Sequence, residues 1–155
     1  GASGLNDGFI KNSNLTYICT HHEQGAGYAA CGEAKVTKNI SVVNPTTGCG
    51  GANCVTALLD AWQDNLPVIF ISGNVKSSQC SSVINEENNC NIRKYGIQES
   101  DIISTVSSMT KFSKFVKSFE NRYTLKVRIL TNCFTNVLRL YFKFIATQKI
   151  LFEIL

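Results

Sequence analysis

The feature that most constrains the fold of this chain is the apolar run Val-Ile-Phe-Ile at 68–71, which directly follows Pro67. A strand that is apolar on both sides is typical of a parallel sheet whose two faces are covered by helices. Strands of this kind need helical crossovers, so the rest of the chain should alternate between strands and helices.

Such an alternation is visible along the chain, and it predicts a three-layer α/β/α domain with a mainly parallel open sheet. The expected central strands lie near 16–20, 40–44 and 68–72, with helices at 23–37 and 53–63. Local composition adds a tight turn at 48–51, a long surface loop at 76–95, a helix at 98–108, a strand at 112–116 and an edge strand at 138–145.

The charge is divided unevenly along the chain. Residues 1–120 hold 9 Lys+Arg against 10 Asp+Glu, a balance of −1, whereas residues 121–155 hold 6 against 1, a balance of +5. The main body therefore gives no electrostatic reason to bind nucleic acid. Basic residues interrupt the apolar C-terminal stretch too often for a membrane span. Seven cysteines, none in a Cys-x-x-Cys pair, are interpreted as free thiols in a reducing, cytoplasmic compartment.

Glu23 stands out because it precedes a helix start made of small residues, Gly-Ala-Gly-Tyr-Ala-Ala at 25–30. Small side chains let another helix or a ligand approach closely and exclude water. Burial of this kind raises the pKa of a carboxyl group and favours its proton-donating form, which is useful in catalysis. The alternative is that Glu23 only occupies the first turn of a helix, where the helix dipole favours an acid.

Five segments occur in an order that resembles the pyrimidine-binding domain of thiamine-diphosphate enzymes, with the acetolactate synthase large-subunit group as the nearest likeness. They are His22-Glu23-Gln24, the loop Thr-Thr-Gly-Cys-Gly-Gly at 46–51, the helix end Ala-Trp-Gln-Asp-Asn-Leu-Pro at 61–67, the strand end Ser72-Gly73, and Gln-Glu-Ser-Asp-Ile at 98–102. The resemblance covers residues 1–120. Residues 121–155 lack the expected turn and are interpreted as a diverged or out-of-frame tail, so the family's first and last strands are expected to be missing from this fragment.

The resemblance implies a function in the chemistry of 2-oxo acids: ylide formation on thiamine diphosphate, decarboxylation and two-carbon transfer. It implies that Glu23 hydrogen-bonds the cofactor's pyrimidine ring and is the catalytic residue. Cys49 stands where the family has proline, which puts the rigidity of that loop in question. The residues implied to bind the cofactor are Glu23, Thr47, Gly48, Cys49, Gly50, Asn53 and Gln98.

The resemblance also implies what this chain does not supply. Mg²⁺ and the diphosphate would be held by a separate phosphate-binding domain, from the same or a second subunit of a homodimer or larger assembly. The chain alone is then expected to be inactive and prone to self-association, and no metal ligand is assigned to it. Whether FAD binds elsewhere in such an enzyme is left open.

Two other interpretations remain at this point. The chain could be a non-catalytic truncated remnant, which a stop soon after Leu155 in the coding sequence would favour. It could instead be a flavodoxin-like module for another nucleotide, which would still bind its ligand without Glu23. The glycines at 48–51 do not complete a dinucleotide fingerprint, because Asn53 stands where its third glycine should be.

Overall fold

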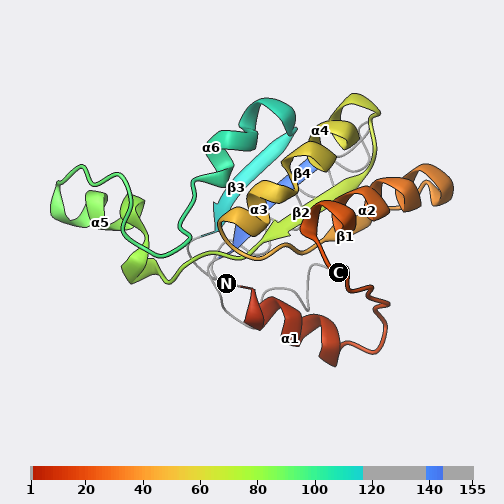
Figure 1. The fold of residues 1–155 in the computed structure, drawn as a ribbon, viewed down its shortest axis with the longest axis horizontal. Coiled ribbons are helices and arrows are strands. Elements are labelled where there is room, and N and C mark those ends of the chain that lie inside the picture. The colour runs from red at the N-terminus through yellow and green to blue at the C-terminus, as the bar shows by residue number, and fades with distance from the viewer. Residues whose placement is uncertain (1, 117–138, 145–155) are drawn as a thin grey trace.

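The computed structural model describes residues 2–116 and the backbone of residues 139–144, which form an α/β domain (Figure 1). Four strands form one sheet in the order β1-β2-β4-β3, and all three neighbouring pairs run parallel. The strands are β1 (Ser41–Val43), β2 (Val68–Ser72), β3 (Phe112–Val116) and β4 (Arg139–Phe144). The predicted parallel α/β fold is therefore confirmed.

Helices connect the strands and supply most of the core. The helices are α1 (Ser3–Lys11), α2 (Glu23–Thr37), α3 (Cys49–Asn53), α4 (Val55–Gln63), α5 (Ser81–Asn88) and α6 (Ile102–Val106), with the short 3₁₀ helices η1 (Ser77–Gln79) and η2 (Ser107–Met109). The predicted strands near 40–44, 68–72 and 112–116 correspond to β1, β2 and β3, and the helix predicted at 23–37 corresponds to α2.

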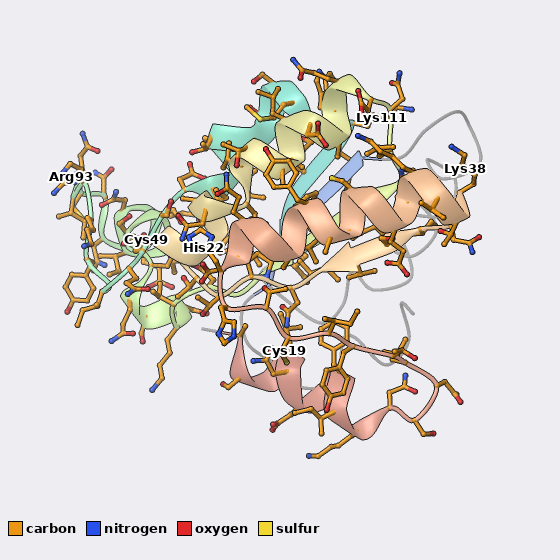
Figure 2. The ribbon with its side chains drawn as sticks, turned by 45° about the vertical axis from the view of Figure 1, so that its right-hand side comes forward. Cys19, His22, Lys38, Cys49, Arg93 and Lys111 are labelled. Atoms are coloured by element: carbon orange, nitrogen blue, oxygen red, sulfur yellow. The ribbon has the colours of Figure 1, made fainter. Side chains whose placement is uncertain are left out.

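The apolar strand β2 is buried along its whole length, as its composition predicts. Val68 and Phe70 belong to a core that also contains residues of α2, α4 and α6. Ile69 and Ile71 alternate with them and are equally buried, so they face the other side of the sheet. Figure 2 shows α1 on the side of β1 that faces away from α2. Helices thus lie on both sides of the sheet.

A glycine sets the spacing between α2 and α4. A Cβ added at Gly27 would lie 2.5 Å from the Cβ of Ala57, which is fully buried in α4. A Cβ added at Gly32, about one and a half turns further along α2, would have no atom within 4 Å. The small residues noted at the start of α2 therefore serve a helix–helix contact on one face, while the other face is open.

The variant Gly27→Ala should unfold at lower urea concentration than the parent. Forcing a methyl group into a packed contact costs about 1–3 kcal/mol, which exceeds the gain of about 0.5–1 kcal/mol from replacing a helical glycine. Gly32→Ala is the matched control and should be more stable than the parent, because only the propensity gain applies. Equal stability of the two variants would contradict the contact between Gly27 and Ala57.

The strand predicted near 16–20 is wrong. This segment forms no strand in the structure and its side chains are largely exposed, with Ile18 at 84% exposure. The physical reason is that a strand is stable only with a hydrogen-bonded neighbour, and no described strand lies beside it. A five-residue apolar run does not replace those missing hydrogen bonds.

Three further expectations for the middle of the chain need correction. The segment 76–95 is not a bare loop, because it contains η1 and α5. Helix α5 has no buried residue, so it shows no apolar period in the sequence, and its C-cap residue Asn89 has a left-handed conformation. The helix predicted at 98–108 is shorter, since α6 begins only after the side chain of Asp101 caps it. The turn predicted at 48–51 is the start of α3.

Strand β4 corrects the expectation of an edge strand at 138–145. Its backbone pairs in parallel with β2 on one side and with β3 on the other, so it lies inside the sheet. The alternation of apolar and basic residues favoured an edge strand. In the structure, the backbone of β4 instead provides hydrogen-bond partners for the backbones of both β2 and β3. It is therefore not a free edge for self-association. The rest of the expected tail, 121–138 and 145–155, lies outside the described residues, and the boundary at 120 stays a prediction.

Candidate functional site

The candidate site lies at the carboxyl ends of β1 and β2. The amide of Gly73, just after β2, donates to the carbonyl of Pro45, just after β1, at 3.2 Å. Helices α2 and α3 both begin at this end of the sheet, and Figure 2 shows His22 and Cys49 there. Ligands of open α/β sheets bind at the carboxyl ends of the strands, so this is the expected place for a site.

Each residue of the His22-Glu23-Gln24 triplet makes a different hydrogen bond. His22 caps α2, because its Nδ1 accepts from the amide of Gln24 at 3.2 Å. The side chain of Gln24 donates to Oγ1 of Thr56 on α4 at 2.7 Å. Glu23 Oε2 accepts from Nδ2 of Asn53 at 3.1 Å. His22 and Gln24 therefore hold the start of α2 in place, and the carboxylate of Glu23 faces Asn53 on α3.

Cys54 is a part of the site that the sequence analysis missed. It is fully buried between α3 and α4, and its thiol donates to the main-chain carbonyl of Glu23 at 3.4 Å. Burial and the nearby Glu23 charge raise the pKa of Cys54 to about 12, so it remains a thiol at neutral pH. No sequence motif marks this contact. All six cysteines within the described residues are free.

The glycine loop approaches Glu23 closely. A Cβ added at Gly50 would lie 3.0 Å from Oε1 of Glu23 and would also meet the side chain of Thr46. Gly48 has φ +62° and ψ −121°, a conformation that favours glycine. Gly50 thus keeps the carboxylate of Glu23 within reach of the loop backbone.

Cys49 occupies the first helical position of α3, after Gly48 as the N-cap. Proline is common at this position because the amide there has no partner within the helix. A non-proline residue fits the same backbone, so the replacement of proline by Cys49 leaves the helix start intact. The side chain of Cys49 is exposed.

Gln98 lies against the glycine loop, although it is 50 residues further along the chain. Its carbonyl accepts from Oγ1 of Thr47 at 3.4 Å, and a Cβ on Gly48 would collide with the same carbonyl. Gln98 itself has φ +58° and precedes α6 instead of starting it. All seven residues implied by the resemblance therefore belong to one cluster of contacts or adjoin it, with Cys49 joined to it through Gly48.

The expectation of a raised pKa for Glu23 is wrong for the described structure. The hydrogen bond from Asn53, followed by one from the backbone of Glu23, holds the pKa of this carboxyl below its ordinary value. Burial acts in the opposite direction but is slight, because Glu23 is only partly covered. Glu23 is therefore an ionised hydrogen-bond acceptor at neutral pH.

Removing the amide of Asn53 should raise the pKa of Glu23, because the largest cause of its depression is lost. We expect this shift in Asn53→Ala, measured by carbon-13 NMR titration of the Glu23 carboxyl. The depressed pKa of Glu23 stabilises the fold above the pKa of the unfolded chain, and this contribution disappears as the pH falls through the folded pKa. Thr56→Ala is the control, since Thr56 bonds Gln24 and not the carboxylate. An unchanged titration in Asn53→Ala would contradict this assignment.

The described residues also bear on other classes of site. Within residues 2–116, no three His, Cys, Asp or Glu side chains gather closely enough to hold a metal ion. Among the helices that the structure describes, none has the length and apolar character needed to cross a membrane.

The fold and the site define a parallel α/β domain that presents a carboxylate and a glycine loop at the carboxyl edge of its sheet. The family model described as thiamine pyrophosphate enzyme, N-terminal TPP binding domain, matches residues 1–105. The chain belongs to this family, whose cofactor is also called thiamine diphosphate, and the resemblance to acetolactate synthases is confirmed.

Several acetolactate synthases are similar to the chain. The large subunit IlvB1 of Mycobacterium tuberculosis is 35% identical over 112 residues, 72% of this chain and 16% of the relative. The mitochondrial catalytic subunit of Saccharomyces cerevisiae is 32% identical over 114 residues, 74% of this chain and 15% of the relative. The isozyme 2 large subunit of Escherichia coli is 32% identical over 111 residues, 72% of this chain and 18% of the relative. The chain thus spans less than a fifth of each of these three relatives.

Proposed function

We propose that this chain is the pyrimidine-binding half of an acetolactate-synthase-like enzyme that acts on 2-oxo acids. The observation that carries the proposal is the placement of the Glu23 carboxylate beside Gly50, at the carboxyl edge of a parallel sheet. Family membership supports thiamine diphosphate as the cofactor. The acetolactate synthase relatives support a 2-oxo acid as the substrate.

The residues present fit the pyrimidine half of the cofactor. A ring that reaches Glu23 must pass close to the glycine loop, and Gly50 carries no side chain that would crowd the carboxylate, since a Cβ there would lie 3.0 Å from Oε1 of Glu23. An aminopyrimidine also needs a polar group that can accept or share a proton. Glu23 is such a group and is partly exposed. The side-chain amide of Asn53 lies beside it, and the main-chain carbonyl of Gln98 borders the glycine loop.

Bound thiamine diphosphate supplies a carbanion-stabilising centre for the decarboxylation of a 2-oxo acid. Glu23 has the task of accepting or sharing a proton with a ring nitrogen. In the free chain its pKa is depressed, but a ring that covers the carboxylate removes water from it, and desolvation raises the pKa of an acid. The proton affinity of Glu23 would then rise when the site is filled, which is the state in which the proton is needed.

The proposal includes partners that lie outside this chain. A charged diphosphate needs Mg²⁺ and oxygen ligands, and we assign these to a phosphate-binding domain of the same or a second subunit. A homodimer or larger assembly follows if the second domain belongs to another copy. FAD has no assigned residue in this chain. Six cysteines of the described residues are free thiols, and we assign the protein to a reducing, cytoplasmic compartment.

Calorimetry with thiamine diphosphate and Mg²⁺ tests the proposal. We expect the 155-residue chain to bind the cofactor with a Kd of about 1 mM or weaker, roughly −4 kcal/mol, because the charged half of the cofactor has no partner here. The pyrimidine half alone, as 4-amino-2-methylpyrimidine, should shift the NMR signals of Glu23, Gly50 and Asn53. Glu23→Gln should remove these shifts.

Two results would contradict the proposal. The first is pyrimidine binding that survives Glu23→Gln, which would favour a module for another ligand. The second is turnover of pyruvate by the isolated, monomeric chain with Mg²⁺ and thiamine diphosphate, since half a site should not suffice.

A further inference from the structure

The carboxylate of Glu99 accepts hydrogen bonds from two separate segments. Its Oε1 accepts from both the amide and the hydroxyl of Ser81, each at 2.6 Å. Its Oε2 accepts from the amides of Tyr95 and Gly96, at 3.0 Å and 3.3 Å. One side chain therefore joins the first residue of α5 to the 95–98 segment, which leads to Gln98.

These hydrogen bonds satisfy a backbone amide at the start of α5 and keep the carboxyl group of Glu99 ionised. Ser81 begins α5, where backbone amides have no partner within the helix, and the N-cap residue Cys80 offers no side-chain cap. Burial raises the pKa of Glu99, but the hydrogen bonds from Ser81, Tyr95 and Gly96 outweigh it and hold the pKa below its ordinary value. The group is therefore a carboxylate at neutral pH, which can accept all four bonds.

Close contacts with other parts of the backbone confine the 95–98 segment at Gly96 and at Gln98. A Cβ on Gly96 would lie 2.5 Å from the carbonyl of Gln79 in η1, so the backbones are in close contact there. At the other end, the carbonyl of Gln98 accepts from Thr47 and leaves no room for a side chain on Gly48. The left-handed φ of Gln98 is sparsely populated for residues other than glycine and needs such support.

We propose that Glu99 is a positioning residue, which holds the 95–98 segment so that Gln98 stays beside the glycine loop of the cofactor site. This inference rests on the proposed function, since it assigns Glu99 to the same site. Glu99 does not touch the loop itself and acts only through the backbone that leads to Gln98. The competing explanation is that Glu99 merely caps α5, which would make its role structural.

Glu99→Gln separates these explanations when it is compared with Ser81→Ala. A glutamine amide keeps one acceptor oxygen and replaces the other by a donor, so in either orientation it cannot accept from Ser81 and from Tyr95 and Gly96 at the same time. Ser81→Ala removes the hydroxyl bond at α5 but leaves Oε2 free to bind Tyr95 and Gly96. Glu87→Gln, on the exposed surface of α5, is the matched control for the change of charge.

The first measurement is amide hydrogen exchange in the 155-residue chain. Exchange at Tyr95 and Gly96 should become at least about tenfold faster in Glu99→Gln and should change less than twofold in Ser81→Ala and Glu87→Gln. Unchanged exchange in Glu99→Gln would overturn the proposal, whatever the function of the site. Equal acceleration in Ser81→Ala would overturn it as well, because capping of α5 would then explain the effect.

The second measurement is the kinetics of pyruvate turnover in a form of the protein that contains a phosphate-binding domain and is active. Glu99→Gln should lower kcat/KM at least about tenfold, while the melting temperature falls no further than in Ser81→Ala. A change in kcat/KM below twofold, with exchange accelerated, would overturn the positioning role. Absence of cofactor-dependent turnover in the parent would refute the proposed function instead, and the exchange measurement would still decide whether Glu99 holds the segment.

Discussion

Glu23→Gln should reduce turnover of pyruvate by roughly 10²–10⁴-fold in an active form of the protein, the range typical of a lost general acid or base. Glutamine keeps the shape of the side chain, and its carbonyl can still accept from Asn53. It cannot take up and release a proton near neutral pH, so the exchange with a pyrimidine nitrogen is lost. The measurement is kcat with saturating thiamine diphosphate and Mg²⁺.

The control for this substitution lies on the same helix. Glu33 is exposed on α2, and its Oε2 accepts from the hydroxyl of Ser41 at 2.8 Å, a bond that glutamine can replace. Glu33→Gln should keep kcat within about twofold of the parent, and neither variant should change the midpoint of urea unfolding appreciably. If Glu23→Gln retains activity within about tenfold, roughly 1.4 kcal/mol in the barrier, Glu23 does not carry the reaction.

The parts of the fold that the sequence predicted correctly are those with a strong local pattern. Strand β2 is apolar at four successive positions, and helix α2 begins at Glu23 and ends at Thr37 as expected. The contact of Glu23 with the glycine loop agrees with the resemblance, which implied that both bind the cofactor. The strand and the helix needed only periodicity and turn residues.

The features that could not be predicted depend on residues far apart in the sequence. The 15–20 segment has strand composition, but whether it joins a sheet depends on a neighbouring strand, which composition does not reveal. The depressed pKa of Glu23 depends on Asn53, 30 positions further along, and the burial argument from small neighbours left that hydrogen bond out. The interior position of β4 is likewise a matter of pairing with β2 and β3.

Gly48→Ala should have the second largest effect, because it alters both the glycine loop and the segment that leads to Gln98. The backbone at Gly48 has φ +62° and ψ −121°, outside the regions that residues with a Cβ adopt without strain. The added methyl group would collide with the carbonyl of Gln98, which is backbone and cannot rotate away. We expect a loss of about 1–3 kcal/mol in the free energy of unfolding and loss of the NMR shifts caused by 4-amino-2-methylpyrimidine.

Two further variants decide whether this loss comes from Gly48 in particular. Gly25→Ala, in the first turn of α2 beside Glu23, adds the same methyl group where no atom lies within 4 Å, so it should not lower stability and should leave pyrimidine binding intact. Gly48→Asn should fail as badly as Gly48→Ala, because asparagine tolerates a positive φ only near ψ +47°, far from the ψ of −121° found here. Recovery of binding in Gly48→Asn would mean that the loop adopts an ordinary left-handed turn, and the close approach of Gln98 to Gly48 would then be wrong.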